Sequence, residues 1–191
     1  QCPMCRTKLG KNDIKTVEKD NIENIDEHEK FINQWGTKMA NLIKYINDNV
    51  KPDNDNRVII FSQWTKMLNM VGGVLDQNNI KNIFIKGNIH MIANSVKRFK
   101  TDNNIRVIML SSDTASSGSN LTEASHIILL DTINADKVHA KAVEEQAIGR
   151  AVRMGQTKNV RVARFIMKDT IEHEYYIRNI GENSASDMIE I

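Results

Sequence analysis

The feature that most constrains the fold is an alternation of short β-branched runs with longer segments of helical periodicity. The runs "RVIIFSQW", "NIFIKG", "RVIML" and "HIILLD" each have the length of a single strand, and the first is apolar enough to be buried on both faces. Before and between them, apolar residues recur every three or four positions, as in "TKMANLIKYINDN" ahead of the first run. In a last run, "VRVARFI", apolar and polar residues alternate, which predicts a strand with one more solvent-exposed face.

Strands separated by helices indicate right-handed βαβ units and therefore a parallel sheet. The sequence predicts an α/β fold, a doubly wound and mostly parallel sheet of roughly five strands with helices on both faces. Ligands of such a sheet are expected outside the carboxyl ends of the strands.

Length and composition divide the chain into a main domain and short appendages. We expect a zinc-finger remnant at 1–10, an acidic linker ending in a helix at 11–35, the α/β domain at 36–181 and a tail at 182–191. No apolar run approaches the roughly 18 residues of a membrane span, so no membrane association is expected. Cys2 and Cys5 are too close together in sequence for a disulfide between them to stabilise the fold. This cysteine usage favours a reducing, intracellular compartment.

The "CPMC" motif supplies two thiolates, half of a four-ligand zinc site. The other half is not in the chain unless His28 and a partner contribute, which the spacing does not suggest. We therefore expect no intact structural metal within this chain, and Cys2 and Cys5 bind Zn²⁺ only as part of a longer finger.

Charge is unevenly distributed along the chain. Residues 11–35 contain four Lys against seven acidic residues, and residues 141–168 contain seven Lys or Arg against two Glu. An anionic partner is therefore expected near the second segment. The alternative is that this excess is an ordinary solvated face.

The positive excess surrounds "EEQAIGRAVRMGQ", residues 144–156, which reads as a helix. At 100° per residue, Gln146, Arg150 and Arg153 fall within about 60° of one another, and small or apolar residues cover the rest. Two neighbouring guanidiniums need an anion or an acidic partner. The alternative is a solvent face on which the arginines pair with local acids such as Glu145.

A second candidate segment is "SSDTASSGSNLT", residues 111–122, after the third predicted strand. Its hydroxyls and backbone N–H groups are donors suited to phosphate oxygens, although a solvated turn has the same composition. The chain has no phosphate-binding loop of the G-x-x-x-x-G-K-[ST] kind. It is therefore not expected to hold a nucleotide by itself.

Three segments together resemble a known family. "VIIFSQW", "LSSDTASSGSNLTEASHIILLD" and "VEEQAIGRAVRMGQTKNVRVARF" follow the order and spacing of motifs IV, V and VI in the Swi/Snf branch of superfamily-two helicase-like ATPases. The resemblance covers residues 36–180. "CPMCR" also resembles the last ligand pair of a RING finger, which one subgroup of the family carries just before its second ATPase lobe.

The resemblance implies that ATP and Mg²⁺ are held between two RecA-like lobes, mainly by a first lobe outside this chain. Arg150 and Arg153 would be arginine fingers that stabilise charge on the γ-phosphate, and Gln146 would help to orient that face. Gly118 and Asn120 match positions near the nucleotide that couple it to DNA. The positions implied as contacts to the backbone of double-stranded DNA are Ser62, Gln63, Gly87, Asn88, Ser111 and Ser112. A local turn or capping role is the alternative for each.

The chain departs from the family pattern in two places. Ala115 and Ser116 stand where motif V usually has paired glycines, and Asp113 stands where it often has Lys. "DTINADKVHAKA" is about five residues longer than the usual D-P-x-W-N-P segment and has neither its Pro nor its Trp. These departures bear on a phosphate contact and on the coupling to DNA.

Three functions remain open at this stage. The first is the second ATPase lobe of a DNA-dependent Swi/Snf-type translocase, with the N-terminal lobe of the same polypeptide as partner. The second is a non-catalytic RecA-like module that binds nucleic acid or protein. The third is part of a RING ubiquitin ligase with an accessory ATPase, partnered by a ubiquitin-conjugating enzyme. A nuclear location is expected, or a viral factory or virion if the source is a large DNA virus.

Overall fold

The computed structural model describes residues 27–115, 118–180 and 188–190. Its centre is a parallel sheet in the order β2-β3-β1-β4-β5-β6. The strands are β1 (Val58–Ser62), β2 (Asn82–Phe84), β3 (Val107–Ser111), β4 (His126–Leu129), β5 (Arg161–Ile166) and β6 (Met188–Glu190). The predicted α/β fold with a parallel sheet is confirmed.

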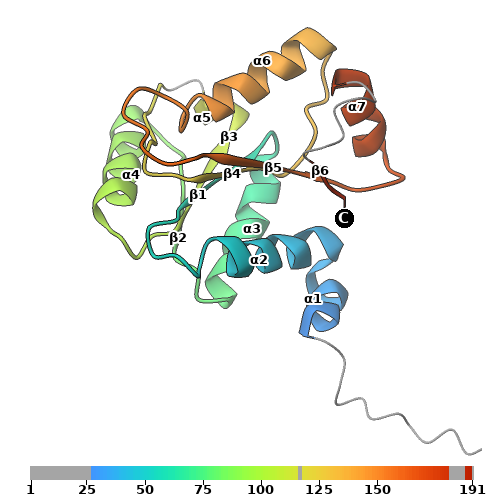
Figure 1. Cartoon of the computed structure of the whole chain (residues 1–191), viewed down its shortest axis with the longest axis horizontal. Helices are drawn as coiled ribbons and strands as arrows, with labels where there is room; N and C mark the ends of the chain where they lie inside the picture. Colours follow the sequence, from blue (N-terminus) through green and yellow to red (C-terminus); the bar gives the residue numbers. More distant parts are fainter. Residues whose placement is uncertain (1–26, 116–117, 181–187, 191) are drawn as a thin grey trace, which may run out of the picture.

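Helices cover both faces of the sheet (Figure 1). On one face lie α1 (Glu27–Trp35), α2 (Thr37–Asn49) and α3 (Thr65–Gln77), and on the other lie α4 (Ile89–Thr101), α5 (Ser112–Ala115) and α6 (Lys137–Ile148). A further helix, α7 (Ile171–Ile180), contacts α6 and β5. This is the doubly wound arrangement that the alternating pattern predicts.

The central strand β1 shows why the sheet forms in this place. All five of its residues are buried, with Val58 and Ile60 in the core beneath α2 and α3 and with Ile59 and Phe61 in the core beneath α4 and α6. Successive side chains point to opposite faces of a strand, so a continuous β-branched run supplies both cores at once.

One difference in extent separates the predicted and the observed elements. A sixth strand, β6, pairs in parallel with β5 and lies inside the segment that the sequence predicts to be a tail. The acidic segment before the domain ends in α1, as predicted, and Phe31 and Trp35 of that helix pack against the core.

The predicted helix over 144–156 is wrong in its C-terminal half. The α-helix ends at Ile148 with Gly149 as its cap, and the amide groups of Arg150 and Ala151 donate to carbonyls three residues back instead of four. The carbonyl of Arg150 instead accepts from the amide of Leu121 at 2.9 Å. In a continued helix this carbonyl would accept from the amide of Met154, so the contact with a distant loop replaces a helical hydrogen bond. Helical periodicity cannot reveal such a contact.

His126, at the amino end of β4, is buried at 3% exposure, and its Nδ1 lies 3.0 Å from the Ser125 hydroxyl. Burial lowers the pKa of His126 below its usual 6.5, and the charge of Arg161 lowers it further. A group whose pKa is depressed on folding binds fewer protons in the native state than in the unfolded chain. Its contribution to stability is therefore present above pH 6.5 and is lost as the pH falls toward the depressed pKa.

We predict that the free energy of unfolding decreases between pH 7.5 and 5.5 and that His126→Gln removes this part of the pH dependence. Urea unfolding at a series of pH values measures it. The exposed His139→Gln is the control and should keep the wild-type profile. Equal pH profiles for wild type and His126→Gln would contradict the assignment.

Candidate functional site

The site residues predicted from the sequence fall into two groups. One lies at the carboxyl ends of the strands, the carboxyl edge of the sheet, and the other lies at their amino ends, the amino edge. Six of them lie at or just after the carboxyl ends of β1, β3 and β2: Ser62, Gln63, Ser111, Ser112, Gly87 and Asn88. Arg150 and Arg153 instead follow α6, which runs from the carboxyl end of β4 back to the amino end of β5. Only the first group lies where ligands of a doubly wound sheet were expected.

The arginine group is assembled from two segments. The Leu121 amide donates to the Arg150 carbonyl, and Nη1 of Arg153 lies 3.5 Å from the Gly118 carbonyl oxygen. Gly118 has φ +74°, a left-handed conformation that favours glycine, and a Cβ placed there would lie 3.9 Å from Nη1 of Arg150. The structure thus brings together the motif V and motif VI residues that the sequence separates by about thirty positions.

The two arginines differ in exposure. Arg150 is 7% exposed, whereas Arg153 is exposed to solvent. Burial, followed by the neighbouring charge of Arg153, lowers the pKa of Arg150. Two close guanidiniums, one of them buried, form a locally positive site, and an anion bound there would relieve their mutual repulsion.

Gln146 and Asn120 have different relations to this group. Gln146 is exposed on the last turn of α6 and therefore precedes the turn that carries the arginines. Asn120 is half-buried, and its side-chain oxygen accepts from the Thr122 amide at 3.2 Å. Asn120 thus supports a local turn through its side chain.

At the carboxyl edge, Ser62 is fully buried and its hydroxyl donates to the Asp131 carboxylate. The other carboxylate oxygen accepts from the Gln63 amide at 3.1 Å, and the Gln63 side chain donates to the Thr132 carbonyl at 2.7 Å. Burial raises the pKa of Asp131, while the bonds from Ser62 and Gln63 oppose that rise. The turn after β1 is therefore fixed to the end of β4.

Ser111 is also buried, and Thr114 completes its turn. The Thr114 hydroxyl accepts from the Ser111 amide at 2.9 Å and donates to the Ser111 carbonyl at 3.0 Å. Asn88 is exposed and caps α4 by accepting from the Met91 amide at 3.0 Å. Gly87, also exposed, has φ +96°, which makes a side chain unfavourable there.

The hydroxyls of Ser62 and Ser111 thus serve the hydrogen bonds of the fold itself in this conformation. Groups with some exposure at the same edge are Gly87 and Asn88, followed by the half-buried Gln63 and Ser112. Sequence reasoning missed Asp131 as the organising residue of this edge. Its signal was an acidic side chain directly after a buried apolar strand, where burial demands hydrogen-bond partners.

Lys38 extends this polar network to α2 and α7. Its buried ammonium donates to the Leu130 carbonyl at 2.8 Å and to Oε1 of Glu172 at 2.7 Å. The other Glu172 oxygen accepts from the Met167 amide at 3.2 Å. The network locks the end of β4 to both neighbouring helices.

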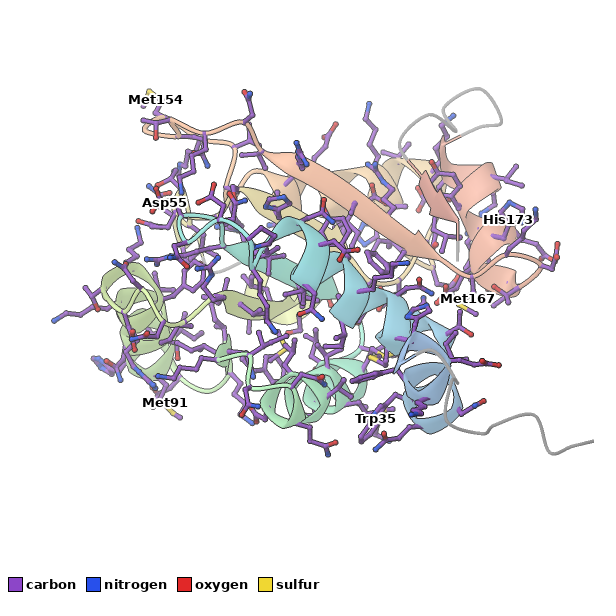
Figure 2. The ribbon with its side chains drawn as sticks, turned by 60° about the horizontal axis from the view of Figure 1, so that its bottom comes forward. Trp35, Asp55, Met91, Met154, Met167 and His173 are labelled. Carbon is purple, nitrogen blue, oxygen red and sulfur yellow. The ribbon has the colours of Figure 1, made fainter. Side chains whose placement is uncertain are left out.

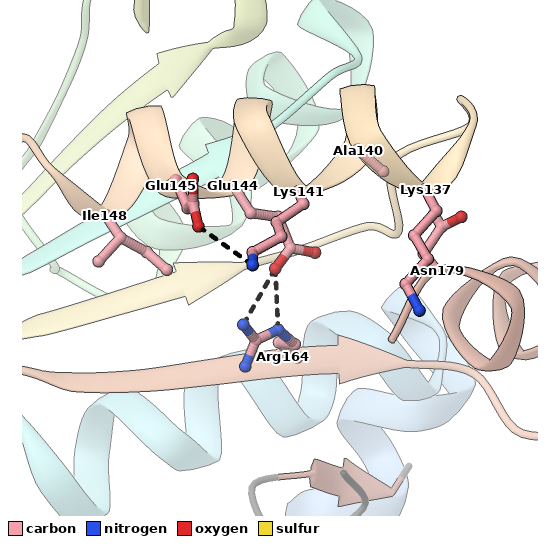
Figure 3. Close-up of a pocket in the computed structure, with 8 residues that line it drawn as sticks. All are labelled: Lys137, Ala140, Lys141, Glu144, Glu145, Ile148, Arg164 and Asn179. Carbon is pink, nitrogen blue, oxygen red and sulfur yellow. Dashed lines mark hydrogen bonds and ion pairs between the residues drawn. The ribbon is translucent and has the colours of Figure 1, made fainter. Parts of the chain in front are cut away.

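A pocket of about 440 Å³ lies between α6, β5 and α7, away from both groups (Figure 3). Arg164 of β5 donates to Glu144 of α6 at 3.0 and 3.1 Å, and Lys141 lies 3.7 Å from Glu145. Four of the five charged side chains of its lining are thus paired with one another, and Lys137 is the fifth. None of the site residues predicted from sequence lines it.

Within residues 27–115, 118–180 and 188–190, no cluster of three or more His, Cys, Asp and Glu side chains could hold a metal ion. The predicted zinc ligands Cys2 and Cys5 lie outside the described residues. Across that same part of the chain, no helix is long and apolar enough to cross a membrane.

The fold and the arginine group define the class of protein. A parallel α/β sheet without a phosphate loop, with two arginines beside a glycine turn, has the features of a RecA-like second lobe. The model of the helicase conserved C-terminal domain matches residues 37–155, and the chain belongs to this family. The resemblance to the C-terminal lobe of Swi/Snf-family helicase-like ATPases is confirmed.

Comparisons with individual proteins agree. The chain is 30% identical over 173 residues to DNA repair protein RAD5A of Arabidopsis thaliana, covering 90% of the chain and 16% of that protein. It is 29% identical over 172 residues to the E3 ubiquitin-protein ligase SHPRH of Homo sapiens, covering 90% of the chain and 10% of that protein. The chain therefore spans a small part of the curated relatives it matches.

A solved structure supports the fold independently. The C-terminal part of the Fun30 ATPase domain superposes with a TM-score of 0.66 and is 26% identical in sequence. The match covers 74% of this chain and 45% of that one.

We predict that Ser62→Ala lowers the free energy of unfolding by about 1–3 kcal/mol, because the buried Asp131 carboxylate loses a donor. The matched control is the exposed Thr65→Ala, expected within about 0.5 kcal/mol of wild type. Urea unfolding with a fitted m-value measures both. Equal stability of Ser62→Ala and wild type would mean that the hydroxyl does not support Asp131.

Proposed function

We propose that this chain is the second ATPase lobe of a DNA-dependent, Swi/Snf-type translocase. The observation that carries the proposal is the pairing of Arg150 and Arg153 beside Gly118 at one edge of the sheet. In this role the arginines stabilise the charge that develops on the γ-phosphate during hydrolysis. The chain supplies half of an active site.

The chemistry of the arginine group fits a phosphate rather than a metal ion. Its charged groups are two guanidiniums, which donate hydrogen bonds in a fork that matches phosphate oxygens. Among the residues that the structure describes, no cluster of acidic and histidine side chains suits a metal ion. Mg²⁺ is therefore assigned to the first lobe. Arg153 is the exposed member of the pair and is therefore the arginine finger that extends furthest toward the γ-phosphate.

DNA is assigned to the opposite, carboxyl edge. Gly87 and Asn88 are exposed there, Asn88 begins a helix, and Gln63 and Ser112 follow neighbouring strands. Backbone N–H groups at such turns and helix starts contact phosphates without reading sequence, as a translocating motor requires. The relatives named above as a DNA repair protein and a ubiquitin ligase support a nuclear location. Nothing in these comparisons supports the viral alternative.

The ubiquitin-ligase alternative has one specific support. SHPRH is named as an E3 ubiquitin-protein ligase and matches 90% of this chain. In this alternative Cys2 and Cys5 complete a RING finger with ligands from upstream sequence, bind Zn²⁺ there and recruit a ubiquitin-conjugating enzyme. It adds a domain to the ATPase and leaves the roles of Arg150 and Arg153 unchanged.

The first prediction concerns the chain alone. The 191-residue chain should not hydrolyse ATP above background with or without duplex DNA, because it has no phosphate loop. Phosphate release at saturating ATP measures this. Robust turnover by the purified chain would refute the division of the active site between two lobes.

The second prediction concerns the protein in which the chain follows its first lobe. Arg153→Ala should reduce DNA-stimulated hydrolysis by about 10³-fold or more and leave DNA affinity within about twofold. The charge-matched control is the exposed Arg98→Ala at the end of α4, which should retain turnover. Unchanged kcat for Arg153→Ala would rule out the finger role.

A further inference from the structure

One exposed aromatic side chain stands at the carboxyl edge. Trp64 is 57% exposed, whereas the chain's other tryptophan, Trp35, packs against the core. Trp64 occupies the cap position before α3 and makes no capping hydrogen bond through its side chain. The indole therefore has no capping role, and more than half of the residue is in contact with water.

The backbone beneath the indole is fixed. The Trp64 amide donates to the Ser62 hydroxyl at 3.0 Å, and the Trp64 carbonyl accepts from the Leu68 amide at 3.2 Å. Ser62 and the Gln63 amide are in turn bound to the buried Asp131. A tryptophan on a rigid turn has only two side-chain torsions to fix on binding, so the entropic cost of using it as a contact is low.

Trp64 shares its edge with the proposed DNA contacts. Ser62 and Ser111 are paired in the register of β1 and β3, and β2, which leads to Asn88, pairs with β3 on the other side. Three consecutive turns thus line one edge, and Trp64 follows the turn of the central strand.

The charges at this edge favour a polyanion over a basic or neutral protein surface. Lys66 and Lys86 are exposed beside the turns after β1 and β2. The acidic residue of the same turn network, Asp131, is buried and bonded to Ser62 and Gln63. Figure 2 shows the side chains around the sheet from one direction, with Met91 marking the start of α4.

We propose that Trp64 is a DNA contact whose indole packs against the deoxyribose and base edges of a duplex, beside the phosphates held by Gln63 and Asn88. The inference rests on the proposed function, since it requires that DNA lies along the carboxyl edge. It adds an apolar contact that is independent of counterion release, unlike the phosphate contacts.

The expected effect of Trp64→Ala is a loss of duplex affinity of about tenfold or more. The slope of log affinity against log salt should stay at its wild-type value, because no phosphate contact is removed. Lys66→Ala should instead reduce the magnitude of that slope by about 0.9 if Lys66 neutralises one phosphate.

The test uses the 191-residue chain and a fluorescently labelled 20-base-pair duplex, titrated at several salt concentrations. A Trp35→Phe background leaves Trp64 as the one tryptophan, so that duplex binding should change its emission. Met70→Ala removes another exposed apolar side chain from α3 and is the matched control, expected to bind as wild type. Trp64→Phe keeps an aromatic ring and should retain most of the affinity, and far-ultraviolet circular dichroism checks that each variant is folded.

The outcomes separate this inference from the proposed function. If wild type binds duplex but the Trp64 emission and the affinity of Trp64→Ala are unchanged, the inference is overturned and the DNA function stands. If Trp64→Ala binds DNA normally but fails to associate with the purified first lobe, Trp64 is a protein contact and the inference is again overturned. If neither the wild type nor any variant binds the duplex, the proposed DNA function and this inference fail together.

Discussion

The burial of the central strands on both faces is the constraint on which the rest of the structure depends. In β1, β3 and β4 every residue is buried, so neither face of these strands can present a polar group to a ligand. Polar chemistry is therefore confined to the two edges, where strands end and chains turn. Both candidate groups of residues lie at these edges.

Confinement to an edge has its own cost, because the turns there are partly buried and their polar groups need partners. At the carboxyl edge the Asp131 carboxylate meets this need by accepting from Ser62 and Gln63. At the amino edge the carbonyl of Arg150 accepts from Leu121. Residues that resemble ligand contacts in sequence are thus partly used to hold the turns that carry the other contacts.

The sheet and its helices could be predicted from the sequence because hydrophobic periodicity reports burial directly. Each predicted strand is present, and so are the helices after the first and second strands. The end of α6 could not be predicted, because the alternative partner of Arg150 is an amide about thirty residues away. β6 could not be predicted either, since a three-residue strand has too short a pattern to identify.

The same reasoning explains the mixed result for the site. The family resemblance implied that Gly118, Arg150 and Arg153 all lie near the nucleotide, and the three residues are adjacent in space. It could not predict that Arg150 is buried while Arg153 is exposed, because that depends on how the turn after Ile148 packs. Individual polar residues such as Ser62 were ambiguous for a related reason. A hydroxyl that can donate to a phosphate can equally donate to a carboxylate of its own fold, and only the tertiary structure decides between them.

The separation of the two edges also bears on the coupling between the proposed ATP and DNA contacts. The segment from Ser111 to Leu121 begins at the carboxyl edge, in the turn bonded through Thr114, and ends against the Arg150 carbonyl at the amino edge. It is the covalent connection between β3 and β4, and its two ends contact the two candidate sites. About ten residues of chain separate these two ends, whereas the buried strands between the edges are held by packing on both faces. Asp113, Ala115 and Ser116, which depart from the family pattern, stand within this same segment of the sequence.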